Sequence, residues 1–192
     1  MSAAGTFLGE GRKLTMDLSQ TIWSATLAVA IYAGFIDWRT RRIPNWLTVS
    51  GFFLGIVLNS ILQGWRGAVV SLEGAGLALG LLLPLVLLRG FGAGDWKLLG
   101  ALGALMGWRA MLVVLVISCL LSGAAALIQI VLTRRVMATL KNILLLLQGF
   151  VVSGLRPNPQ VSLDNPTLAK LPFGTAVAAA TALCFVATHW LR

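Results

Sequence analysis

Long apolar runs with few charged residues constrain this chain more than any other feature of its sequence. They lie near residues 20–36, 46–63, 68–88, 98–107, 110–132 and 172–191. A helix of about 20 apolar residues spans the hydrocarbon core of a bilayer. The chain is 58% hydrophobic and only 11% charged, whereas about a quarter of the residues of a soluble globular protein are charged. The sequence therefore predicts an all-α polytopic membrane protein with six transmembrane helices.

The number of crossings depends on residues 98–132. A single helix over this range would be about 52 Å long, against a hydrocarbon core of about 30 Å, so we expect a break at Gly107-Trp108-Arg109. Six crossings place ten basic residues on one side, and by the positive-inside tendency that side is the cytosol. They are Arg39, Arg41, Arg42, Arg89, Lys97, Arg134, Arg135, Lys141, Arg156 and Lys170. The sequence thus predicts a multi-pass protein of the inner (plasma) membrane with both termini outside.

The expected membrane domain covers residues 20–192 and follows an N-terminal tail, 1–19. Within this domain, we expect residues 133–171 to form a cytosolic loop. It contains an interfacial or re-entrant helix at Ile143 to Val152, which is too short to cross the membrane. A cleaved signal peptide is the alternative for 20–36, but the basic cluster Arg39 to Arg42 beyond it favours a retained first span. We expect residues 1–15 to be unstructured and dispensable, with Met16 as the natural start.

The net charge of +9 falls in the short connectors between apolar runs, so it indicates membrane topology and not a nucleic-acid surface. Cys119 and Cys184 both lie within apolar runs, without a Cys-x-x-Cys pair or a histidine cluster. Neither a disulfide framework nor a zinc site is indicated, and we expect no metal and no cofactor.

Two of the six acidic residues, Asp37 and Asp95, stand out by their position. Asp37 ends the first expected span and Asp95 begins the fourth, so two crossings separate them and both face the same side. Acids at the edge of the hydrocarbon are costly, which makes them functional candidates. The alternative is that they are interfacial anchors, with Asp37 paired to Arg39 or Arg41 and Asp95 paired to Lys97.

The surroundings of the two aspartates add weaker signals. Gly92 and Gly94 precede Asp95 and remove side-chain bulk, so an extended peptide backbone could approach the carboxyl group; the alternative is a flexible helix start. Pro44 suits the start of the second span. Asn45 either caps that helix or positions a partner group, and capping is the simpler interpretation.

Together these residues resemble the type IV prepilin peptidase family of GxGD aspartic proteases. The resemblance covers Asp37 with Ile43-Pro44-Asn45, the run Gly92-Ala93-Gly94-Asp95-Trp96-Lys97-Leu98-Leu99, and the late element Leu171-Pro172-Phe173-Gly174. It implies that Asp37 and Asp95 are catalytic, and that Gly92, Gly94, Lys97, Pro44 and Asn45 belong to the motif or bind substrate. It also implies a six-helix enzyme that cuts the leader peptide of pilin-like precursors after a glycine at the cytosolic membrane face.

The resemblance also implies the partners: a prepilin substrate, the lipid bilayer and other pilus-assembly proteins, but no nucleic acid. Longer members of the family carry an N-methyltransferase activity and a cytosolic region with paired cysteines. This chain has no such cysteines and a short first cytosolic loop. It therefore resembles the short, peptidase-only forms associated with tight-adherence (Flp-type) pili.

Two carboxyl groups in close approach do not both ionise readily, so one keeps a proton. The ionised one would act as general base on a water molecule, and the protonated one would polarise the peptide carbonyl. Because the pair titrates as a unit, the sequence does not say which aspartate does which. An ion- or proton-coupled transporter and a non-catalytic pilus-assembly scaffold remain alternatives. A serine or cysteine protease is disfavoured because the sole histidine, His189, has no evident nucleophile partner.

Overall fold

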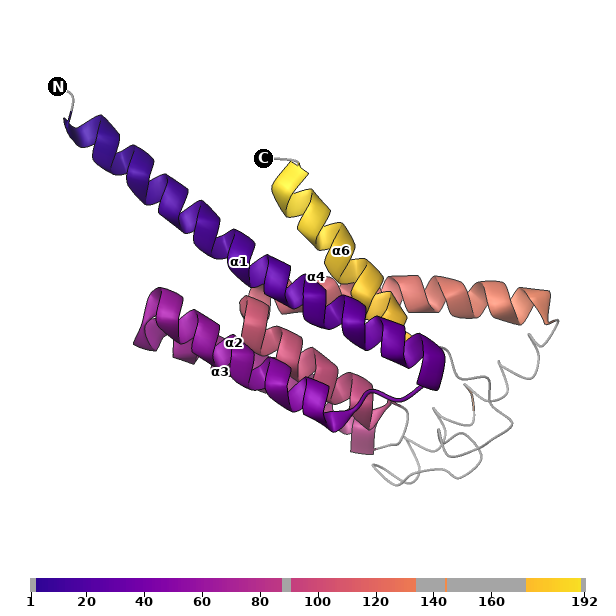
Figure 1. The fold of residues 1–192 in the computed structure, drawn as a ribbon. Helices are drawn as coiled ribbons and strands as arrows, with labels where there is room; N and C mark the ends of the chain where they lie inside the picture. The colour runs from indigo at the N-terminus through magenta and orange to yellow at the C-terminus, as the bar shows by residue number, and fades with distance from the viewer. Residues whose placement is uncertain (1–2, 88–90, 134–143, 145–171, 191–192) are drawn as a thin grey trace.

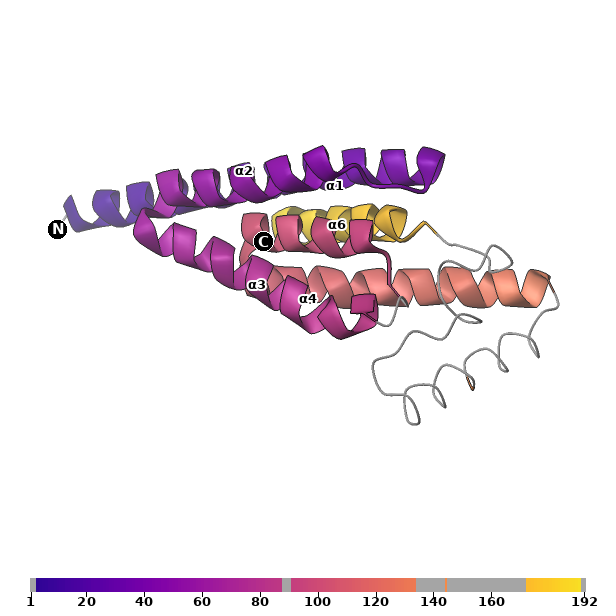
Figure 2. The ribbon, with the colours of Figure 1, turned by 90° about the horizontal axis from the view of Figure 1, so that it is seen from below.

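The structure is a computed structural model that describes residues 3–87, 91–133, 144 and 172–190. Its helices are α1 (Ala3–Thr40), α2 (Asn45–Gln63), α3 (Trp65–Leu87), α4 (Ala93–Leu132) and α6 (Phe173–Trp190). The bundle is shown in two views in Figures 1 and 2. No strand occurs in these described ranges, which confirms the all-α class. The interfacial helix expected at Ile143 to Val152 lies outside them except for Leu144.

Four helical segments are long and apolar enough to cross a membrane. They are Ser19–Thr40, Asn45–Gln63, Trp65–Leu87 and Ala93–Leu132, and a shorter apolar helix covers Phe173–Thr188. Large apolar side chains such as Phe53, Ile61 and Leu120 are exposed on the outside of the bundle, where lipid would cover them. These features fit a multi-pass membrane protein, whereas the count of six crossings stays a prediction.

The chain breaks within α4 at Gly107, where the sequence predicts an interruption. Gly107 has φ 75° and ψ 171°, a combination open to glycine alone. At this point the chain turns back, so that the second segment of α4 does not continue the first (Figures 1 and 2). Residues 93–106 form a helical segment only about 21 Å long at 1.5 Å per residue. The label α4 therefore covers two helical segments with different directions.

Several helix boundaries differ from the predicted ones, and two of the differences bear on the aspartates. α1 continues four residues beyond the expected end at 36, and α4 begins at Ala93 and not at 98. Asp37 therefore lies near the last turn of α1 and Asp95 in the first turn of α4, not in connectors. Main-chain hydrogen bonds within the helices thus fix the backbone of both residues.

The expectation that residues 1–15 are unstructured is wrong for the part that the structure describes. α1 begins at Ala3 and runs without interruption into the first apolar run. No proline lies between Ala3 and Thr40, so no residue in this stretch lacks an N–H donor. Once the apolar part forms a helix, extending it backwards needs no new nucleus.

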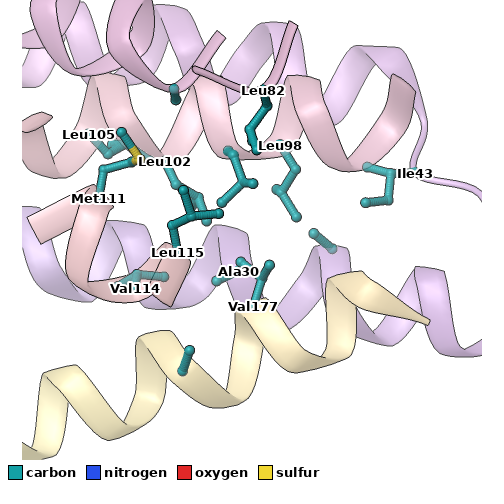
Figure 3. Close-up of a cluster of buried hydrophobic side chains, with 14 of the residues drawn as sticks. Ala30, Ile43, Leu82, Leu98, Leu102, Leu105, Met111, Val114, Leu115 and Val177 are labelled. Atoms are coloured by element: carbon teal, nitrogen blue, oxygen red, sulfur yellow. The ribbon is translucent and has the colours of Figure 1, made fainter. Parts of the chain in front are cut away.

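The core lies between α1, α3, both segments of α4 and α6, and it reaches the start of α2. Figure 3 shows Leu102 and Leu105 of the first α4 segment beside Met111 and Leu115 of the second. Ala30 of α1, Val177 of α6 and Leu82 of α3 also belong to this core. The fold-back at Gly107 thus brings both halves of α4 into one core.

A buried polar cluster joins α2, α3 and α4 near the fold-back. The Asn59 side chain in α2 is 2% exposed, and its Nδ2 donates to the Ser71 hydroxyl at 2.9 Å and to the carbonyls of Ala104 and Leu105 at 3.0 Å. Ser71 in turn donates to the carbonyl of Gly55 at 3.1 Å. Every buried polar side-chain atom in the described part of the chain has a hydrogen-bond partner. This cluster fixes how the three helices are placed.

Candidate active site

Three helix ends and one connector meet at one end of the bundle and carry the predicted site residues. α1 supplies Asp37, the connector supplies Ile43 and Pro44, and α4 supplies Asp95. A Cβ built on Gly94 would lie 3.3 Å from the Cβ of Ile43, so the start of α4 packs directly on the connector. The prediction that both aspartates lie at the same end is therefore confirmed by their positions.

Asp37 is buried, with 6% of its surface exposed. Its Oδ2 accepts a hydrogen bond of 2.8 Å from the backbone N–H of Gly174, at the start of α6. α1 ends just beyond it, where Arg41 has φ 51° and donates its N–H to the Asp37 carbonyl at 2.8 Å. This left-handed residue turns the chain away from α1 towards α2.

Asp95 is partly buried in the first turn of α4. The helix is capped by Gly92, whose carbonyl accepts the N–H of Trp96 at 3.0 Å. A Cβ on Gly92 would lie only 2.6 Å from Oδ2 of Asp95, so glycine at this position leaves room for the carboxyl group. Asp37 is near enough for its charge to act on Asp95. The two carboxyl groups thus lie at the same end of the bundle, within range of each other's charge.

The contacts of the two aspartates differ from those of salt-bridged interfacial anchors, although Arg41 is near enough for its charge to act on Asp37. Within the described residues neither aspartate forms a salt bridge, and Asp37 is held instead by the amide of Gly174. The guanidinium of Arg39 lies over the ring of Phe35, 5.4 Å from its centroid. Lys97 donates to the side-chain oxygen of Asn45 at 3.0 Å.

Asn45 does not cap α2, so the simpler interpretation of this residue is wrong. Pro44 occupies the N-cap position, with φ −70° and ψ 139° and no side-chain capping bond, as expected from its suitability for a helix start. Asn45 is the first residue inside the helix, and its side chain reaches Lys97 on α4 instead. It therefore positions a partner group, which is the other possibility that the sequence offers.

A groove of about 470 Å³ begins at this Asn45–Lys97 pair. Thr48, Val49, Phe52 and Phe53 of α2 line it together with Leu79 of α3 and Gly100 and Ala101 of α4. The groove is mainly apolar, and Lys97 is the charged group among its lining residues.

Several residues that sequence reasoning gave no role support the site. The rings of Phe91 and Phe173 meet edge to face, with centroids 5.1 Å apart, and thereby join the approach to α4 with the start of α6. The indole N–H of Trp96 donates to the carbonyl of Leu79 at 2.8 Å, which ties the Asp95 turn to α3. The sequence contains the Pro-Phe-Gly element and the Asp95 motif, but nothing in it indicates these contacts.

The chemistry that this arrangement allows is acid–base chemistry on a bound carbonyl. Oδ1 of Asp37 and the carboxyl group of Asp95 accept no hydrogen bond from any described residue. Two carboxyl groups with open oxygens can divide proton removal from water and proton donation between them. The described residues contain no group of three or more His, Cys, Asp or Glu side chains that could hold a metal ion.

The sequence is similar to two curated proteins, each described as a prepilin leader peptidase/N-methyltransferase. The one from Legionella pneumophila is 34% identical over 100 residues, which cover 49% of this chain and 35% of the relative. The one from Escherichia coli (strain K12) is 31% identical over 111 residues, which cover 55% of this chain and 49% of the relative. The chain thus spans less than half the length of these relatives. No solved structure gives a significant match.

The sequence profile of the type IV leader peptidase family matches residues 24–127. This range is more than half of the chain and contains both Asp37 and Asp95 together with the Gly92 to Lys97 motif. The Pro172-Phe173-Gly174 element lies beyond it. On this match, the chain belongs to the type IV leader peptidase family.

Proposed function

We propose that the protein is a membrane-embedded aspartic endopeptidase that removes the leader peptide of type IV, Flp-like prepilins after a glycine. One observation supports this most: the buried Asp37 and the partly buried Asp95 lie together at one end of an apolar bundle. The family membership supports the substrate class. Cutting at the cytosolic face of the inner membrane follows from the charge bias of the connectors.

In the proposed reaction, one carboxylate removes a proton from a water molecule that attacks the scissile carbonyl. The other carboxyl group, still protonated, donates a hydrogen bond to the carbonyl oxygen and later a proton to the leaving amine. Gly92 and Gly94 keep side-chain bulk away from Asp95, so an extended substrate backbone can reach the pair.

The direct test is cleavage of an Flp-like prepilin in membrane vesicles that contain the full chain. Mass spectrometry of the products should show a free leader peptide that ends in glycine. Precursor that stays intact in vesicles with correctly inserted protein would contradict the proposal. This outcome would favour the non-catalytic pilus-assembly scaffold.

An ion- or proton-coupled transporter receives less support from the positions of the acids. Transport pathways use ionisable groups inside a bundle, at intermediate depth. Asp37 and Asp95 both lie at helix ends. Glu73 lies within α3, but its side chain is exposed on the surface of the bundle and does not face an interior pathway.

Lys97 is the residue that we assign to substrate binding in the groove. Its ammonium group is held by Asn45 at 3.0 Å at one end of the groove, and it has no acidic partner among the described residues. It therefore suits an acidic side chain of the precursor that follows the cut. The apolar part of the groove suits the apolar residues of the same precursor segment.

Lys97→Met should raise KM for prepilin cleavage by about tenfold, because one charge-assisted hydrogen bond is lost. Lys97→Arg keeps the positive charge and should change KM less. Arg109→Met is the matched control, since Arg109 is exposed over Trp108 near the fold-back of α4. If KM stays the same for Lys97→Met, Lys97 does not bind the substrate.

The proposed orientation gives a topology prediction. Reporters fused after Arg42, Lys97 and Arg156 should report the cytosol, and those after Trp65 and Arg109 the outside. The reason is the placement of the basic connectors together with a reversal at Gly107. A cytosolic signal after Arg109 would mean that residues 98–132 cross the membrane without the predicted return.

A further inference from the structure

We infer that the start of α6 positions Asp37 for the reaction through the backbone of Gly174, and that position 174 requires glycine. This inference rests on the proposed peptidase function. It concerns the segment Pro172-Phe173-Gly174, which lies outside the part of the chain matched by the family profile. It assigns Gly174 a positioning role, since the residue acts through Asp37.

The first observation is the hydrogen bond between Gly174 and Asp37. The backbone N–H of Gly174 donates to Oδ2 of Asp37 at 2.8 Å, across 137 residues of sequence. No other described residue donates to this carboxyl group. The bond therefore fixes the rotation of the carboxyl group and leaves Oδ1 as the oxygen available to water or substrate.

The second observation is the lack of room for a side chain at position 174, and it does not depend on the hydrogen bond from the Gly174 N–H. A Cβ on Gly174 would lie 2.9 Å from Oδ2 of Asp37, 3.0 Å from its Cβ and 3.1 Å from its Cγ. Asp37 is buried within α1, so its side chain has little freedom to move away. Any larger residue at 174 must displace either the carboxyl group or the start of α6.

Two further contacts hold the start of α6 against both elements that carry the aspartates. Phe173 packs edge to face on Phe91, which immediately precedes the Gly92 cap of α4. On the α1 side, a Cβ on Gly34 would lie 2.7 Å from the Cβ of Ala178 and 3.1 Å from the carbonyl oxygen of Gly174. Close packing at Gly34 thus sets the distance between α6 and Asp37.

The main test is Gly174→Ala in the full chain, assayed for prepilin cleavage in membrane vesicles. Cleavage should fall by about tenfold, because the close contacts at 174 need a shift of part of an ångström and a full 1 Å misplacement costs about 100-fold. The displacement should also weaken the hydrogen bond from the backbone N–H of residue 174 to Asp37. Because this bond favours the ionised carboxylate, the limb of the pH profile that Asp37 controls should move to higher pH. Arg41 and Asp95, the other charged groups that interact with Asp37, are unchanged in this variant.

Gly123→Ala is the matched control, since an added Cβ there meets no atom within 4 Å. It should cleave like the wild type. A Gly174→Ala protein that is inserted normally and cleaves within twofold of wild type overturns the inference. So does one whose whole pH profile is lowered without moving, because this pattern indicates less folded enzyme and not a displaced Asp37.

A second set of variants covers the case in which Gly174→Ala does not accumulate in the membrane. Gly34→Ala should lower cleavage by pushing α6 away from α1, and adding Ala178→Gly should restore part of it by removing the opposing methyl group, while the contact with the Gly174 carbonyl oxygen remains. Full activity of an inserted Gly34→Ala protein, or no recovery in the double variant, would count against the inference. Asp37→Asn in the same assay tests the peptidase proposal separately: if this variant still cleaves, the proposed function fails, whatever happens at Gly174.

Discussion

Asp37→Asn and Asp95→Asn should each lower the rate of leader cleavage by about 1,000-fold, within the range expected for losing an acid–base group. Asparagine has nearly the same shape as aspartate, but it neither ionises nor donates an acidic proton. The proposed reaction needs one ionised and one protonated carboxyl group at the same time. Neither single variant can provide both, so loss at either position should be equally severe.

The measurement is the initial rate of prepilin processing in vesicles with equal amounts of inserted protein. Glu73→Gln is the matched control, because it makes the same type of change at an exposed acid on α3. It should process the precursor like the wild type. Normal cleavage by either aspartate variant would remove the aspartic mechanism. Inhibition by a chelator that zinc then reverses would contradict the metal-free reaction.

Gly74→Ala should lower the free energy of unfolding by about 1–3 kcal/mol, the usual range for overpacking a tight contact. A Cβ on Gly74 would lie 2.8 Å from the carbonyl carbon of Gly103 and 2.9 Å from that of Gly107. These are backbone atoms, which cannot rotate away as a side chain can. α3 and the first segment of α4 pack closely because both carry glycine at this contact, a common arrangement between membrane helices.

Stability can be measured by denaturant titration of the protein in mixed micelles. Gly76→Ala is the control on the same helix, since an added Cβ there meets no atom within 4 Å. Its free energy of unfolding should not fall, and the higher helix propensity of alanine should raise it by about 0.5–1 kcal/mol. Equal stability of the Gly74 and Gly76 variants would mean that α3 and α4 are not in backbone contact at Gly74.

Much of the fold can be predicted from the sequence because the bilayer leaves few choices. Apolar runs of membrane-spanning length must form helices, since no water is present to bond their backbone groups. The apolar runs between residues 45 and 87 accordingly became α2 and α3 with nearly the predicted bounds. The break at Gly107 follows from length alone, because residues 98–132 are too long for one crossing.

The sequence was less informative where a boundary depends on more than hydrophobicity. The polar end of α1, residues 37–40, is helical although it lies beyond the apolar run. Residues 93–97 are likewise helical before the next run begins. In both places main-chain hydrogen bonds continue a helix that the apolar part has started. A hydropathy pattern cannot predict these extra residues, because they lie outside the apolar runs.

For the candidate site, the sequence by itself determined which residues to propose for the chemistry: the two aspartates and the glycines that leave space beside Asp95. Only the tertiary structure decided what holds them, because those contacts join residues far apart in the chain. The amide of Gly174 reaches Asp37 across 137 residues, and Lys97 reaches Asn45 across 52. A backbone donor carries no side-chain signature, and the partner of an asparagine depends on how two helices pack. Sequence periodicity therefore cannot reveal either contact.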